Sequence, residues 1–202
     1  MKNRGPILTL VAIAVLGLVL FLVNLSAAPG TPPLTDAAAG AAATTTASAE
    51  PVAAATPFPA QASYTGKTEG KAPPEAAIAI TVKGEKASSY VCDGKSVEAW
   101  YNGTAKDGKL ELKGKGDNKL TGTLNGDTIT GEVSAGGKTW KFTAKLAQKP
   151  AGLYRASGGG TTTGWIRQPD GAVTGLMSNG APAPPLDTAT AQSVEGDTAV
   201  VN

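Results

Sequence analysis

Apolar and polar residues alternate along the central part of this chain in short runs, each ended by a turn sequence. The turns contain glycine, often beside an acidic residue, an asparagine or a second glycine: Gly84-Glu85, Asp93-Gly94-Lys95, Asp107-Gly108, Gly116-Asp117-Asn118, Asn125-Gly126 and Gly136-Gly137. Alternation with a period of two residues is typical of β-strands with one buried face. Short turns that contain glycine join neighbouring antiparallel strands. The pattern therefore predicts a meander of at least seven antiparallel strands.

Each turn also predicts the register of the two strands that it joins. The predicted cross-strand pairs are Ala105 with Leu110, Gly103 with Leu112, Leu112 with Gly122, Thr123 with Thr128, Leu120 with Gly131, Glu132 with Lys141, and Gly131 with Phe142. Several of these pairs place a glycine opposite a large apolar side chain, and one pairs opposite charges. Both arrangements are favourable in a sheet.

One face of the predicted strands is apolar throughout. The residues expected to point inward are Ile78, Ile80, Val82, Val91, Val97, Ala99, Tyr101, Leu110, Leu112, Leu120, Leu124, Ile129, Val133, Trp140, Phe142 and Leu146. A long meander closes into a barrel or folds over as a sandwich, because an open sheet would leave two unpaired edges and a bare apolar face. We therefore expect an all-β fold, an antiparallel up-and-down meander that closes as a small barrel, with a sandwich as the alternative.

Three further short strands are predicted at 152–156, 161–168 and 172–177, with Pro169-Asp170-Gly171 as the turn between the last two. The lysine-rich meander, the phrase KFTAKLAQKPAGLYRA and the closing GWIRQPDGAVTG together resemble membrane-anchored exported β-domains of high-GC Gram-positive bacteria. This resemblance covers about 63–180. It implies a β-fold and a location outside the cytoplasm, and no established activity accompanies it.

The N-terminal part of the sequence predicts where the β-domain is located. The segment from Ile7 to Val23 is almost entirely apolar, Lys2 and Arg4 precede it, and no charge follows until Asp36. This pattern is typical of a transmembrane anchor whose C-terminal side is extracytoplasmic, or of a signal peptide. The length of the run favours a retained single-pass anchor in the cell membrane. The small residues in Leu25-Ser26-Ala27-Ala28 leave cleavage, and thus secretion, as the alternative.

The chain divides into four predicted parts. Residues 1–28 form the transmembrane anchor or signal peptide, 29–62 a disordered linker rich in alanine, threonine and proline, 63–180 the extracytoplasmic all-β domain, and 181–202 a disordered tail. The linker and the tail contain too few large apolar groups to offset the entropy of an ordered chain.

The composition argues against most enzymatic chemistry. The chain has no histidine and one cysteine, so it lacks the commonest general base and the usual residues of Cys-rich or His-rich metal sites. The aspartates Asp93, Asp107, Asp117 and Asp127 lie at separate turns, and no spacing of carboxylates in the sequence predicts a pair. We therefore expect no enzyme, no metal site and no cofactor. The 18 Lys and Arg residues are nearly balanced by 16 Asp and Glu residues. Such a small net charge predicts no nucleic-acid partner.

The alternation sends one group of apolar residues, Tyr90, Cys92 and Trp100, to the outer face of the meander. An apolar group on the outer face of a sheet is expected to be buried by another part of the chain or by a partner. One interpretation is that the C-terminal strands, which carry Trp165, pack over this face and bury Cys92. The other is that Tyr90, Trp100 and Trp165 form a recognition patch, since aromatic side chains dominate such interfaces.

These observations predict a non-enzymatic binding or scaffold domain of the cell envelope, tethered to the outer face of the membrane by its N-terminal helix. Its partner would be an envelope protein or a glycan. The alternative is a lipocalin-like carrier that holds a small apolar ligand in the barrel interior. Because Tyr101, Trp140 and Phe142 are expected to point inward, the barrel should be filled by its own side chains, which favours the scaffold function.

Overall fold

The structure is a computed structural model that describes residues 56–70 and 75–201. All the regular secondary-structure elements within these residues are β-strands, so the predicted all-β class is confirmed. The predicted anchor at 1–28 and most of the predicted linker lie outside the described residues. The described part of the chain contains no helix long and apolar enough to span a membrane.

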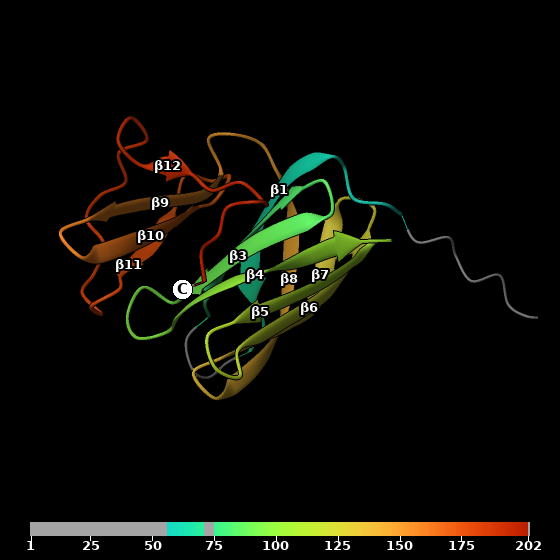
Figure 1. Ribbon diagram of the computed structural model, residues 1–202, viewed down its shortest axis with the longest axis horizontal. Coiled ribbons are helices and arrows are strands. Elements are labelled where there is room, and N and C mark those ends of the chain that lie inside the picture. The colour runs from blue at the N-terminus through green and yellow to red at the C-terminus, as the bar shows by residue number, and fades with distance from the viewer. Residues whose placement is uncertain (1–55, 71–74, 202) are drawn as a thin grey trace, which may run out of the picture. The chain divides into compact units, whose positions relative to one another are not determined.

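The first eight strands form a closed antiparallel barrel, which confirms the barrel and excludes the sandwich (Figure 1). Their bounds are β1 Gln61–Thr68, β2 Ala77–Lys83, β3 Lys86–Cys92, β4 Glu98–Lys106, β5 Lys109–Gly114, β6 Lys119–Asn125, β7 Thr128–Ala135 and β8 Lys138–Ala147. Each strand pairs with the next, and β1 pairs with β8 to close the barrel. The sequence did not predict β1, because Tyr64 is its one large apolar residue and the alternation is therefore weak.

Two of the predicted turns have the predicted register. All the pairs expected across Asp107-Gly108 occur, including Ala105 with Leu110, and so do those expected across Gly136-Gly137. The two residues of the first turn have φ angles of 49° and 70°, and those of the second have 57° and 76°. Positive φ at both central residues is the requirement of a type I′ turn, which these residue types meet.

Two other predicted registers are wrong by two residues. The structure pairs Asn125 with Thr128, so the turn is Gly126-Asp127, one residue later than predicted. At the preceding turn, Leu112 faces Leu120, two residues before its predicted partner. A shift of two residues keeps each side chain on the same face of the sheet. The predicted division into inward and outward residues therefore survives both errors.

The barrel interior is filled by apolar side chains. Of the residues predicted to point inward, all are buried in the barrel core except Val97, which is partly buried against it, and Leu146. The prediction for Leu146 is wrong: its side chain is 40% exposed. Its backbone N–H donates to the carbonyl oxygen of Asp127, in the turn between β6 and β7. Leu146 thus lies at the end of the barrel, where the core stops.

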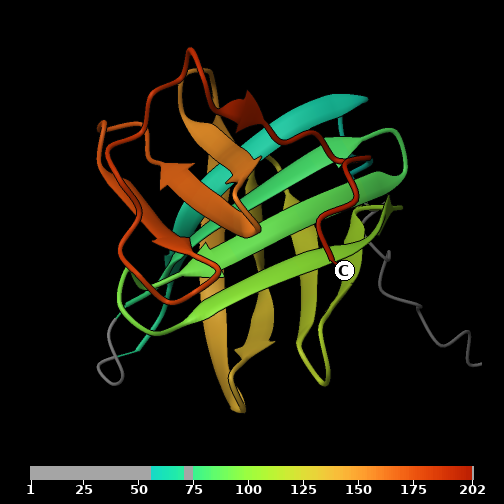
Figure 2. The same ribbon diagram turned by 60° about the vertical axis from the view of Figure 1, so that its left-hand side comes forward.

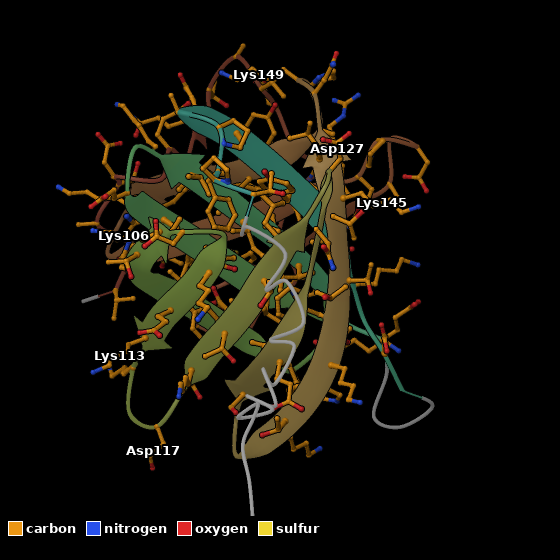
Figure 3. The ribbon with its side chains drawn as sticks, turned by 90° about the vertical axis from the view of Figure 1, so that its right-hand side faces the viewer. Lys106, Lys113, Asp117, Asp127, Lys145 and Lys149 are labelled. Atoms are coloured by element: carbon orange, nitrogen blue, oxygen red, sulfur yellow. The ribbon has the colours of Figure 1, made fainter. Side chains whose placement is uncertain are left out.

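Lysines occupy the side of the barrel that is not covered by other strands. Lys109, Lys113, Lys141 and Lys145 are exposed, as the alternation predicts. Figure 3 shows Lys113 and Lys145 on this side of the barrel, with their side chains directed away from it. This face carries both signs of charge, since Glu132 lies opposite Lys141 in the β7–β8 pair.

The remaining strands form a second sheet in the order β11-β10-β9-β12. Their bounds are β9 Gly152–Gly158, β10 Thr161–Arg167, β11 Val173–Met177 and β12 Gln192–Ser193. Leu153, Ile166 and Leu176 of this sheet pack against Tyr90 and Cys92 on the outer face of the barrel. In Figure 2 the second sheet, in orange and red, lies across the green strands of the barrel. The structure thus has the cover that the outward apolar residues require.

The segment 181–201 differs from the disordered tail expected from its composition. After β11 it pairs with the second sheet through the bridge between Leu176 and Pro182 and then through β12. Val194 and Val200 are buried against the barrel and the second sheet. The segment has few large apolar residues, but partners far away in the sequence supply the burial and the hydrogen bonds that fix its path.

Candidate functional site

The three aromatic residues of the predicted recognition patch lie in different surroundings. Tyr90 has no exposed surface, Trp165 is 5% exposed, and Trp100 is partly exposed. Trp165 packs in a separate cluster with Tyr154 and donates its Nε1–H to the carbonyl oxygen of Pro184 at 2.8 Å. The structure therefore does not bring the three rings together on one exposed surface, because the second sheet covers Tyr90. Of the three, Trp100 is the one that is not buried.

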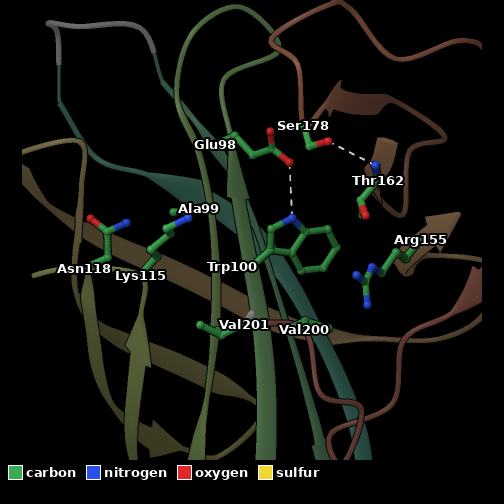
Figure 4. A pocket seen from close by; sticks show the side chains of 10 residues that line it. All are labelled: Glu98, Ala99, Trp100, Lys115, Asn118, Arg155, Thr162, Ser178, Val200 and Val201. Carbon is green, nitrogen blue, oxygen red and sulfur yellow. Dashed lines mark hydrogen bonds between the residues drawn. The ribbon is translucent and has the colours of Figure 1, made fainter. Parts of the chain in front are cut away.

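Trp100 lines an open cleft of about 500 Å³ between the barrel and the second sheet (Figure 4). The cleft is built from elements that are distant in the sequence. β4 supplies Glu98 and Trp100, and the turn between β5 and β6 supplies Lys115. Arg155 comes from β9, and Ser178 follows β11. Sequence reasoning found only Trp100, because no local pattern marks the other residues.

The Trp100 ring is held by contacts on two sides. Its centroid lies 4.1 Å from that of Tyr90, with 31° between the ring planes. A Cβ atom added to Gly164 of β10 would lie 2.5 Å from Cζ2 of Trp100. The absence of a side chain at this glycine thus allows the second sheet to approach the two rings closely.

Glu98 is the acidic residue of the cleft, and its carboxylate is occupied. Oε1 accepts hydrogen bonds from Nε1 of Trp100 and from the hydroxyl of Tyr90, both at 3.2 Å. Burial raises the pKa of Glu98, and the two hydrogen bonds offset only part of that effect. Burial likewise raises the pKa of Tyr90, so its hydroxyl remains a donor.

Arg155 extends along the same ring. Its Cζ lies 5.8 Å from the ring centroid of Trp100, within the distance of a cation–π contact. Nη1 donates a long hydrogen bond of 3.4 Å to the carbonyl oxygen of Ala199. Nε is buried and has no hydrogen-bond partner within the described part of the chain. The guanidinium group therefore retains unused donor capacity.

Val200 and Val201 form part of the wall of the cleft, and Asn102 of β4 holds them in place. Its Oδ1 accepts the backbone N–H of Val200 at 2.8 Å and that of Val201 at 3.0 Å. Its Nδ2 donates to Ser88 Oγ at 2.9 Å and to the carbonyl oxygen of Thr198 at 2.8 Å. We call this arrangement the Asn102 clasp. No signal in the sequence predicts it, because the partners of Asn102 in the C-terminal segment lie 96 to 99 residues away along the chain.

Cys92 contributes no reactive thiol to the site. It has no exposed surface, and its Sγ accepts a hydrogen bond from the backbone N–H of Gly94 at 3.2 Å. Burial raises the pKa of the Cys92 thiol, which disfavours the reactive thiolate. Across residues 56–70 and 75–201, no group of three or more histidine, cysteine, aspartate or glutamate side chains is placed to hold a metal ion.

Comparison of the chain with protein-family models, with curated proteins and with solved structures finds no match.

Proposed function

We propose that this protein is a non-enzymatic binding domain of the bacterial cell envelope, held at the outer face of the membrane by its N-terminal segment, and that the Trp100 cleft receives its ligand. The observation that carries the proposal is the partly exposed Trp100 ring in an open cleft lined by polar and charged side chains. Ligand sites commonly combine such an aromatic surface with a few polar groups that set orientation. The apolar run from Ile7 to Val23 supports the envelope location.

The polar groups of the cleft are better suited to recognition than to reaction. Glu98 is the carboxylate of the cleft, and two hydrogen bonds hold it against Trp100 and Tyr90. Lys115 and Ser178 are exposed. Ser178 Oγ accepts the backbone N–H of Thr162 at 3.1 Å, and its hydroxyl can still donate to a ligand. The ligand would thus meet a rigid aromatic surface surrounded by donors and acceptors.

The carrier alternative would place the ligand inside the barrel. Tyr64, Tyr101 and Phe142 are fully buried there, together with the aliphatic residues of eight strands. The Trp100 cleft, of about 500 Å³, is on the outside of the barrel. A second cavity, of about 470 Å³ and lined by residues such as Lys67 and Pro169, is also on the outside. This packing favours the external cleft as the ligand site.

The proposal is tested by photo-crosslinking of the full-length chain in the envelope of intact bacterial cells. One variant carries a photo-reactive amino acid in place of Ser178, at the cleft. A matched control carries it in place of Lys138, an exposed residue that does not line the cleft. We expect a defined adduct with an envelope component from position 178 and none from position 138. No adduct from position 178, or the same adducts from both positions, would overturn the proposal.

A further inference from the structure

The Trp100 cleft contains more positive than negative charge. Lys115 and Arg155 line it, and neither forms a salt bridge with an acidic residue of the described chain. The cleft has one carboxylate, Glu98, which is already the acceptor for Trp100 and Tyr90. The free charge of the cleft is therefore complementary to an anion.

Arg155 places a guanidinium group in the wall of the cleft, beside the Trp100 ring. Its position is fixed in the middle of the second sheet, where it pairs with Gly164 on one side and Gln192 on the other. Its buried Nε–H is without a partner in residues 56–70 and 75–201, and a buried donor in that state is costly. A carboxylate or phosphate oxygen matches the fork of a guanidinium group. An anion in the cleft would approach the terminal nitrogens of Arg155, because Nε is closed to an atom of the size of water.

The rest of the cleft fits a sugar better than a small free anion. A volume of about 500 Å³ lies in the range of sites for small organic molecules, about 300–1,000 Å³. The Trp100 ring offers a sugar ring the part of its apolar surface that Tyr90, Gly164 and Arg155 leave exposed. Asn118 and Ser178, on opposite walls, offer an amide and a hydroxyl for hydrogen bonds to sugar hydroxyl groups.

We propose that the ligand of the Trp100 cleft is an anionic saccharide, with its acidic group on Arg155 and a sugar ring against Trp100. Lys115 contributes a second positive charge at the other side of the ring, as Figure 4 shows. This inference rests on the proposed function, since it names the chemical class of the ligand for the same cleft. A uronic acid and a sugar phosphate share the required chemistry, and experiment separates them.

The inference is tested by calorimetric titration of the full-length protein, reconstituted in lipid nanodiscs, with three probes. The probes are tri-galacturonic acid, the neutral trisaccharide galactotriose and glucose 6-phosphate. We expect binding of tri-galacturonic acid, of glucose 6-phosphate or of both, at least about tenfold tighter than that of galactotriose, and weaker at high salt. Which of the two binds identifies the acidic group. Equal binding of galactotriose, or no binding of either anion, overturns the inference.

Variants test the named cations. We expect Arg155→Met, which keeps an apolar stem, to weaken binding of the anionic probe about tenfold or more, and Lys115→Met to weaken it a few-fold. Lys113→Met is the matched control, because Lys113 is exposed nearby on β5 and does not line the cleft. Unchanged binding by Arg155→Met with a native circular dichroism spectrum contradicts the inference. If Arg155→Met is unfolded, the binding of the anionic probe is compared between Lys115→Met and Lys113→Met. Equal binding by these two variants contradicts the inference.

The two proposals fail separately. If the crosslinker at Ser178 still captures an envelope component but neither anionic probe binds, the cleft is a binding site for a ligand of another class, and only this inference is lost. If position 178 captures nothing in cells, the proposed function itself is lost.

Discussion

Single residues decide how closely the second sheet packs on the barrel. Gly164 of β10 lies directly against the stacked rings of Tyr90 and Trp100. An added Cβ would be 2.5 Å from Trp100 and 2.7 Å from Tyr90, well inside van der Waals contact. The rings cannot retreat freely, because the Trp100 indole is hydrogen-bonded to Glu98.

Gly164→Ala should therefore lower the free energy of unfolding by about 1–3 kcal/mol, the usual cost of overpacking. Gly158→Ala is the matched control: Gly158 lies in the neighbouring strand β9, and a Cβ there would meet nothing within 4 Å. Urea unfolding of both variants measures the difference. Equal stabilities of the two variants would contradict the close contact at Gly164.

Glu98 predicts a pH dependence of stability. Burial raises the pKa of Glu98 above its ordinary value of 4.5, so the folded protein holds this proton more tightly than the unfolded chain. The contribution of Glu98 to stability is therefore greatest below about pH 4.5 and declines as the pH rises through the folded-state pKa. Glu98→Gln, which keeps an oxygen acceptor for Trp100 and Tyr90, removes this titration.

We expect the stability of Glu98→Gln relative to the native protein to increase between pH 4 and pH 7, as measured by urea unfolding at several pH values. Other groups, including Asp93, cancel in this difference because both proteins contain them. A difference that is independent of pH, or that runs in the opposite direction, would refute the buried environment of Glu98.

At the scale of the elements, the C-terminal segment is attached to the barrel mainly by polar contacts. The Asn102 clasp satisfies the backbone groups of Thr198, Val200 and Val201. The side chain of Ser88 adds a hydrogen bond toward the carbonyl oxygens of Gly196 and Thr198, at 3.1 Å and 2.9 Å. These contacts give a segment with little apolar surface a defined path along the barrel.

Asn102→Ala should lower stability by about 2–3 kcal/mol, because it leaves partly buried backbone donors without acceptors. Asn125→Ala, at an exposed position of β6, should change stability by less than about 0.5 kcal/mol. Hydrogen exchange provides the specific readout: the amides of Val200 and Val201 should exchange faster in Asn102→Ala. Unchanged exchange at these two amides would show that other contacts hold the segment.

At the scale of the whole described unit, the barrel and the second sheet share an apolar interface. Cys92 lies in this interface, packed among residues of both layers and without exposed surface. Gln168 adds a polar contact, since its Nε2 donates to the carbonyl oxygen of Gly66 at 2.9 Å. A thiol at this position therefore reports on separation of the two layers.

We expect Cys92 to react with a thiol reagent roughly a thousandfold more slowly than in the unfolded chain, which corresponds to an opening free energy of about 4 kcal/mol. Gly164→Ala should accelerate the reaction, while Gly158→Ala should not. Labelling kinetics with a chromogenic disulfide measure these rates. If Cys92 of the native protein reacts as fast as a free thiol, the second sheet does not cover it.

Local patterns in the sequence are sufficient for the meander and for its inward face. Residues such as Leu110 and Ile129 could be assigned to the core because alternation within a strand and the chemistry of the next turn are both local properties. The register of two hairpins does not follow from local patterns, because neighbouring residue pairs such as Asn125-Gly126 and Gly126-Asp127 can both form the turn. Strand β1 was missed because Tyr64 is its only strong signal.

The candidate site depends on contacts that no local pattern encodes. Glu98, Lys115 and Arg155 meet because the barrel closes and the second sheet then folds across its outer face. The same packing buries Tyr90 and leaves Trp100 at the edge, although the two rings are equivalent in the alternation. Parity along a strand tells which face a side chain occupies, and only the packing of distant elements determines whether that face meets water, a ligand or another sheet.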